Sequence, residues 1–87
     1  MNESEFKDIV KDVESEMRDS LVETSVNGFS VEIVYKSSSG KQKHAANMEF
    51  DKNSGKCTIT FIAYPTASTP NQFIERVQDR MREVLNN

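Results

Sequence analysis

The sequence of 87 residues is poor in the side chains that carry most protein chemistry, with one cysteine, one histidine and no tryptophan. A lone cysteine, Cys57, excludes a disulfide framework and is typical of a reducing compartment. No apolar run approaches the roughly 20 residues that a membrane-spanning helix needs, and no signal peptide is recognisable. These absences predict a small cytoplasmic protein that does not enter a membrane.

The chain does contain a clear hydrophobic periodicity, at a modest hydrophobic content of 36%. This combination indicates a folded chain rather than a disordered one. We expect a single α+β domain that spans residues 1–87 and lies near the lower limit for a self-sufficient core. Support from a dimer or a partner would suit such a size.

The first segment, Glu3–Val22, predicts an amphipathic helix. Its apolar positions recur three and four residues apart, as one buried helical stripe requires, at Phe6, Ile9, Val10, Val13, Met17 and Leu21. Asn2 is a suitable N-cap, with Glu5 as its capping-box partner. The run Val22–Asn27 is expected to be the fading end of this helix, and Gly28 marks its exit.

Three strands are predicted after this helix, because polar and apolar residues alternate or β-branched residues dominate. They are Phe29–Lys36, His44–Asp51 and Cys57–Tyr64. A tight hairpin at Lys52–Gly55 pairs Asp51 with Lys56, with Gly55 at positive φ. One continuous buried face then requires the layers Phe29/Phe50/Cys57, Val31/Met48/Ile59 and Ile33/Ala46/Phe61, with Tyr35/His44/Ala63 at the rim.

A second amphipathic helix is predicted at the end of the sequence. Its apolar residues are Phe73, Ile74, Val77, Met81, Val84 and Leu85. Thr69 stands at its N-cap, with Pro70 at the first helical position and Gln72 as capping-box partner. The element order is therefore α-β-β-β-α: a three-stranded antiparallel meander with two helices packed on one face.

The candidates for chemistry are few. The predicted register places His44 and Cys57 at opposite ends of one sheet face, so we expect His44 at the rim, Cys57 in the core and no catalytic pair. The loop Ser37–Lys41 lacks the upstream glycine and the following helix of a phosphate-binding loop. The turn after Asp51 offers too few ligands for a metal ion. We therefore predict no enzyme, no catalytic residue, no cofactor and no metal site.

The first of two candidate binding surfaces lies on the first helix, because residues 1–24 hold eight acidic and three basic side chains. Six acids spaced three or four residues apart would form one acidic stripe: Glu5, Asp8, Asp12, Glu16, Asp19 and Glu23. Like charges at this spacing cost roughly 0.2–0.5 kcal/mol per pair in an isolated helix. Two interpretations stay open: an ordinary solvated face, or a docking surface for a basic partner.

The second candidate surface is the face of the sheet that no helix covers. Its layers are predicted as Ser30/Glu49/Thr58, Glu32/Asn47/Thr60, Val34/Ala45/Ile62 and Lys36/Lys43/Tyr64. Half of this face is polar, as an exposed face should be. Val34, Ala45 and Ile62, with the neighbouring Tyr64, form a small apolar patch that is either an ordinary exposed cluster or a contact for a second copy of the chain.

The predicted order α-β-β-β-α resembles that of the double-stranded RNA-binding domain over nearly the whole chain. The resemblance implies RNA binding with the first helix facing the RNA and a lysine-rich motif at the start of the second helix gripping phosphates. Here the corresponding segment, TPNQFIER (Thr69–Arg76), holds a single arginine, and the first helix is acidic. An acidic chain is a poor candidate for neutralising phosphates, so nucleic-acid binding is kept only as an alternative function.

The preferred prediction is a non-catalytic domain that binds another protein. Small acidic α+β proteins of this size are similar in general character to immunity proteins, antitoxins and phage-encoded inhibitors, which neutralise basic enzymes by charge complementarity. The similarity implies a basic partner held by the acidic stripe. A homodimeric structural component joined through the open sheet face is the third hypothesis, and no membrane partner is expected.

Overall fold

The computed structural model describes residues 1–18, 22–36, 42–61 and 69–86, which form two helices and a four-stranded antiparallel sheet. The elements are α1 (Glu3–Glu16), β1 (Val22–Asn27), β2 (Ser30–Lys36), β3 (Gln42–Asp51), β4 (Lys56–Phe61) and α2 (Thr69–Leu85). The strands lie in the sheet in their sequence order, β1-β2-β3-β4. The α+β class is confirmed, whereas the predicted count of three strands is wrong because β1 precedes them.

Helix α1 begins as its sequence predicts. The side-chain oxygen of Asn2 accepts a hydrogen bond from the backbone N–H of Glu5 at 2.8 Å, and the Glu5 carboxylate accepts one from the backbone N–H of Asn2 at 3.1 Å. This capping box satisfies two backbone donors that have no partner inside the helix. The helix ends at Glu16, however, so its predicted continuation to Val22 is wrong.

Strand β1 is formed by the segment Val22–Asn27, which the sequence interpretation assigned to the end of the first helix. Burial alternates along it: Val22 is buried, whereas Glu23 and Ser25 are exposed. A two-residue turn, with Gly28 at a φ of 63°, joins it to β2. Glycine adopts this backbone region without steric cost, and β-branched residues at alternate positions favour a strand. The segment therefore pairs with β2 instead of extending α1.

The predicted register is confirmed over most of the sheet. The confirmed pairs are Val31–Met48 and Ile33–Ala46 between β2 and β3, and Phe50–Cys57, Met48–Ile59 and Ala46–Phe61 between β3 and β4. The turn between β3 and β4 closes with a hydrogen bond of 2.8 Å from the backbone N–H of Gly55 to the carbonyl oxygen of Asp51. Gly55 has the positive φ that the turn requires, 73°.

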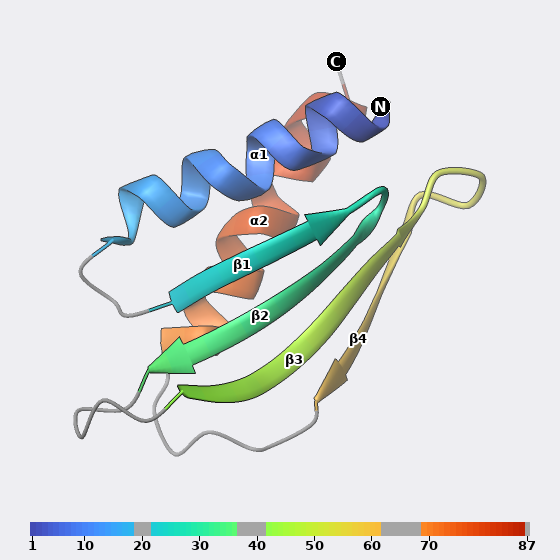
Figure 1. Ribbon diagram of the computed structural model, residues 1–87. Coiled ribbons are helices and arrows are strands. Elements are labelled where there is room, and N and C mark those ends of the chain that lie inside the picture. Colours follow the sequence, from blue (N-terminus) through green and yellow to red (C-terminus); the bar gives the residue numbers. More distant parts are fainter. Residues whose placement is uncertain (19–21, 37–41, 62–68, 87) are drawn as a thin grey trace.

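Beyond Ile33 the predicted register fails. The pairing shifts between Ile33 and Val34, so that Val34 faces His44, and Ala45 becomes the extra residue of a β-bulge. A bulge bends its strand and increases the local twist, and Figure 1 shows β3 as a long, curved strand. The predicted pairs of Val34 with Ala45 and of Tyr35 with His44 are therefore wrong by one residue on β3.

Both helices pack on the same face of the sheet, as predicted (Figure 1). The buried core lies between the helices and the sheet and comprises Phe6, Val10, Val13, Val22, Val31, Ile33, Ala46, Met48, Phe50, Phe73, Ile74, Val77 and Met81. The rings of Phe6, Phe29 and Phe50 contact one another, with centroid distances of 5.9, 6.2 and 5.7 Å. Because α1 and α2 are the only helices in the described ranges, the opposite face of the sheet has no covering layer there.

The end of α2 departs from the predicted buried stripe. Val84 and Leu85 are 38% and 44% exposed, although their spacing continues that of the buried residues before them. The side chains of Thr69 and Pro70, which carry part of the predicted cap, lie outside the described part of the chain. Of the helices that the structure describes, neither combines the length and the apolar character that crossing a membrane requires.

Candidate functional site

The acidic stripe is shorter than its sequence spacing suggests. Glu5, Asp8, Asp12 and Glu16 lie on α1 and are exposed. Glu23 lies on β1, so it is not part of the same helical surface, and Asp19 lies outside the described residues. In the described part of the chain, four of the six predicted acids share the surface of α1, and the placement of Glu23 in the helical stripe is wrong.

Two of these four acids already have partners within the fold. The Glu5 carboxylate belongs to the capping box. Glu16 forms an ion pair with Arg80 of α2, and its second oxygen lies 3.8 Å from the Arg76 guanidinium. These contacts hold the end of α1 to α2. The other two of the four are Asp8 and Asp12, whose carboxylates make no hydrogen bond or ion pair with any residue in the described ranges.

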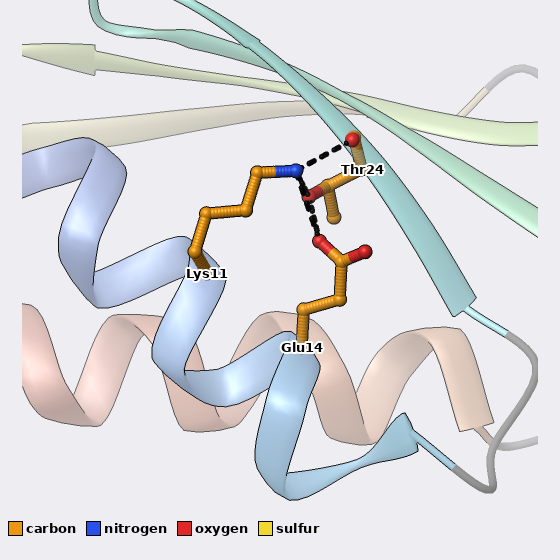
Figure 2. A network of polar contacts seen from close by, with 3 residues as sticks. All are labelled: Lys11, Glu14 and Thr24. Carbon is orange, nitrogen blue, oxygen red and sulfur yellow. Dashed lines mark hydrogen bonds and ion pairs between the residues drawn. The ribbon is translucent and has the colours of Figure 1, made fainter.

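The other flank of α1 binds the first strand, as Figure 2 shows. The Lys11 ammonium donates to the backbone oxygen of Thr24 at 2.9 Å, to the Thr24 hydroxyl at 3.1 Å and to the Glu14 carboxylate at 3.2 Å. The Thr24 hydroxyl in turn donates to Glu14. The side chains of Lys11 and Glu14 therefore join α1 to the β1 edge of the sheet, and their charges are paired within the fold.

The uncovered face of the sheet carries two rows of polar residues. Each row contains one residue from each of the four strands, and neighbouring members of a row face each other across adjacent strands. One row is Ser25, Glu32, Asn47 and Thr60, and the other is Asn27, Ser30, Glu49 and Thr58. We call them the polar rows. Together with Val31 they line a shallow concavity of about 500 Å³. The β2–β4 part of both rows agrees with the predicted layers.

Both charged side chains within the polar rows are acidic, and the adjoining pair of the same face, Asp51 and Lys56, holds one acid and one base. Glu32 and Glu49 are exposed, and no lysine or arginine is among the eight residues. The Ser30 hydroxyl donates a hydrogen bond of 3.2 Å to the Glu49 carboxylate, which helps to orient that side chain. Such a surface favours a ligand with hydrogen-bond donors and positive charge.

The predicted apolar patch on the same face is only partly described. Val34 is half-buried, and it faces His44 rather than Ala45. The side chain of Ala45, together with Ile62 and Tyr64, lies outside the described part of the chain. The predicted layer of Val34 with Ala45 is wrong because of the bulge, so the patch does not have the register that suggested it.

In the described part of the chain, the residues with catalytic potential do not come together in a site. Cys57 is half-buried against the core, with its sulfur 3.9 Å from that of Met81. Burial raises the pKa of the Cys57 thiol, and the nearby Arg82 opposes this shift. A protonated thiol is a weak nucleophile. The side chain of His44 lies outside the described part, and among the described residues no three acidic, histidine or cysteine side chains are placed to hold a metal ion.

Sequence reasoning missed the contribution of β1 to the polar rows and to the attachment of α1. Ser25 and Asn27 extend the polar rows to the sheet edge, and Thr24 receives Lys11. The signal was present in the sequence: valine and threonine alternate with polar residues before the pair Asn27–Gly28, a strong indication of a hairpin. The helical spacing that continues through Met17 competed with it.

Comparisons with known proteins identify no relative of this chain. No protein-family model matches the chain, and neither a curated protein nor a solved structure shows significant similarity to it.

Proposed function

We propose that this is a non-catalytic domain that binds a basic surface of another protein through the outward side of α1. The observation that carries the proposal is the state of Asp8 and Asp12. Both carboxylates are exposed, they lie one helical turn apart, and they make no ion pair with the described residues. Their mutual repulsion is relieved when a cationic side chain approaches.

The neighbouring contacts suggest what kind of group would bind. Glu16 follows Asp12 by one helical turn and is held by the guanidinium groups of Arg76 and Arg80. An arginine side chain is thus accommodated next to this helical surface within the protein itself. A partner with exposed arginine or lysine residues would meet Asp8 and Asp12 in the same way, and the attraction would raise the association rate and weaken with salt.

Nucleic-acid binding has less support. The arginines of α2 that would contact phosphates already pair with carboxylates: Arg76 and Arg80 with Glu16, and Arg82 with Asp79. The first turn of α2 contains no acidic residue to repel phosphate, but it also contains no lysine or arginine to bind it. RNA binding is therefore treated as an alternative outcome of the experiment and not as a second proposed function.

The test compares the native protein with the variant D8K/D12K as bait in cell extract, at low and at moderate salt. Glu16 is left unchanged because its reversal would disrupt the contact between α1 and α2. The matched control is E75K/E83K, which makes the same change of charge on exposed positions of α2. We expect a basic protein to be retained by the native protein and by the control but not by D8K/D12K.

Two results would contradict the proposal. Equal retention of the same protein by all three baits would show that Asp8 and Asp12 are not the contact. Retention of RNA by the native protein, with tighter retention by D8K/D12K, would instead support the RNA-binding alternative.

A further inference from the structure

We propose that the polar rows bind an extended, arginine-bearing segment of a protein. Only the basic character of the partner rests on the proposed function. The binding surface itself is different, because α1 and the acidic stripe lie on the opposite side of the sheet (Figure 1). The domain would therefore present two separate acidic surfaces, one on each side.

The two carboxylates of the polar rows come from adjacent strands, β2 and β3. Glu32 faces Asn47 and Glu49 faces Ser30 on the neighbouring strand, so the two glutamates are diagonal neighbours in adjacent rows. Residues related in this way lie about 7–8 Å apart and remain within reach of long side chains. Like charges at such positions repel each other, and neither row contains a base; Lys56, in the adjoining pair, faces Asp51.

A guanidinium group matches this arrangement better than an ammonium group. It is planar and carries five N–H donors in a fixed geometry, so one arginine can donate to two carboxylates at once. The Ser30 hydroxyl already occupies one oxygen of Glu49 and holds that carboxylate in place. The ammonium group of a lysine carries the same charge, but its three donors lie on a single nitrogen atom. We therefore expect lysine to bind more weakly than arginine.

The remaining residues of the rows fit a peptide backbone. Ser25, Asn27, Thr58 and Thr60 are exposed and offer hydroxyl and amide groups that donate and accept hydrogen bonds. Four strands about 4.8 Å apart span roughly 14 Å, which equals about four residues of extended chain. The rows hold no aromatic side chain for stacking on a base, which disfavours single-stranded nucleic acid, and their charge disfavours any phosphate.

The first test uses the unmodified protein, labelled with ¹⁵N, and acetylated tetra-arginine amide as the probe. Tetra-lysine of the same charge and tetra-glutamate serve as comparisons. We expect tetra-arginine to shift the backbone resonances of the polar rows, with weaker shifts from tetra-lysine and none from tetra-glutamate. Shifts confined to α1, or the absence of any shift at millimolar peptide, would overturn the proposal without any substitution.

The second test measures affinity for tetra-arginine in the native protein and in two double variants. E32Q/E49Q removes both carboxylate charges with little change of shape and should weaken binding at least about tenfold. E75Q/E83Q removes two charges from exposed positions of α2 and should bind within about twofold of the native protein. Equal weakening in both pairs would show general electrostatic attraction and overturn the proposed site.

The variant D8K/D12K separates this inference from the proposed function. If the sheet face binds the peptide, D8K/D12K should retain the shift pattern over the polar rows even though it loses the protein partner. If D8K/D12K retains the protein partner while E32Q/E49Q loses peptide binding, the proposed role of α1 is wrong and the proposed site on the sheet face is supported. If D8K/D12K loses the partner while E32Q/E49Q still binds the peptide, the proposed site on the sheet face is wrong and the role of α1 is supported.

Discussion

Lys11 places its ammonium nitrogen 2.9 Å from the backbone oxygen of Thr24, and so attaches helix α1 to the β1 edge of the sheet. Asn27 and Ser30 pair across the two-residue turn, which directs the carbonyl group of Thr24 away from β2. An unpaired strand edge invites pairing with another chain, and a lysine at the edge is one way to prevent it. The contact therefore attaches the helix and protects β1 at the same point.

The first prediction concerns this contact. Lys11→Met keeps the aliphatic stem but removes the donor, so the Thr24 oxygen loses its charged partner. The side chain of Lys11 is 42% exposed, so solvent screens part of the interaction. We expect a loss of about 1 kcal/mol in the free energy of unfolding, measured by urea denaturation. Lys7→Met, at an exposed position of the same helix, should change it by less than about 0.5 kcal/mol.

The second prediction concerns the ion pair between Glu16 and Arg80, which links α1 to α2. A double-mutant cycle with Glu16→Gln and Arg80→Gln should give a coupling energy of about 0.5 kcal/mol, because both side chains are partly exposed. The coupling should fall when salt is raised to about 1 M, where the Debye length is about 3 Å. A coupling that persists at that salt concentration would contradict a simple surface ion pair.

The third prediction concerns the two glycines in tight turns. Gly28 and Gly55 have φ values of 63° and 73°, which side-chain-bearing residues rarely adopt. A Cβ at Gly55 would meet no atom within 4 Å, so the backbone conformation alone sets the effect of a substitution there. Gly55→Ala should destabilise the fold by about 1–2 kcal/mol. Gly55→Asn should destabilise it less, because asparagine tolerates this region; equal losses would contradict the explanation.

The fourth prediction concerns pH and the turn after β3. Hydrogen bonds from the backbone N–H of Asn53, at 2.9 Å, and from the Ser54 hydroxyl lower the pKa of Asp51 from its ordinary value of 3.8. Its contribution to stability is therefore complete above pH 3.8 and is lost as the pH falls through the lower folded pKa.

An NMR titration of the Asp51 carboxyl group checks this directly. The midpoint should lie below 3.8 in the folded protein, and Ser54→Ala should move it upward. Ser4→Ala, at an exposed position remote in sequence, should leave the midpoint unchanged. A midpoint at or above 3.8 would show that these hydrogen bonds do not favour the ionised carboxylate.

The sequence was informative wherever one local rule acted without competition. The capping box at Asn2 and Glu5 follows from side chains three residues apart, and the structure contains it. The pairing of β3 with β4 follows from the turn that ends in Gly55 together with the need for one buried face. These features depend on residues close in sequence, so they can be predicted without knowledge of the rest of the fold.

The sequence was misleading where two periodicities overlapped. Met17 and Leu21 continue the helical spacing, while Val22, Thr24 and Val26 begin the alternation of a strand. Pairing with β2 decides between them, and that is a tertiary effect. The bulge at Ala45 had no local signal, because no glycine stands at that position.

The candidate surfaces were predictable to the same extent. The polar rows of β2, β3 and β4 were predicted because they follow from the register, whereas their continuation onto β1 was not. The acidic residues of α1 were identified from spacing alone. Spacing gives no information about neighbours, so the pairing of Glu16 with α2 became visible only in the structure.

The order β1-β2-β3-β4 also bears on how the chain reaches this structure. Each strand pairs only with strands adjacent in sequence, so the sheet can grow by successive hairpins with short loops to close. Such local topology is associated with fast folding. The exception is the packing of α2 against α1, which joins opposite ends of the chain across the core. We therefore expect the docking of α2 to be the slow, cooperative step, completed after the hairpins have formed.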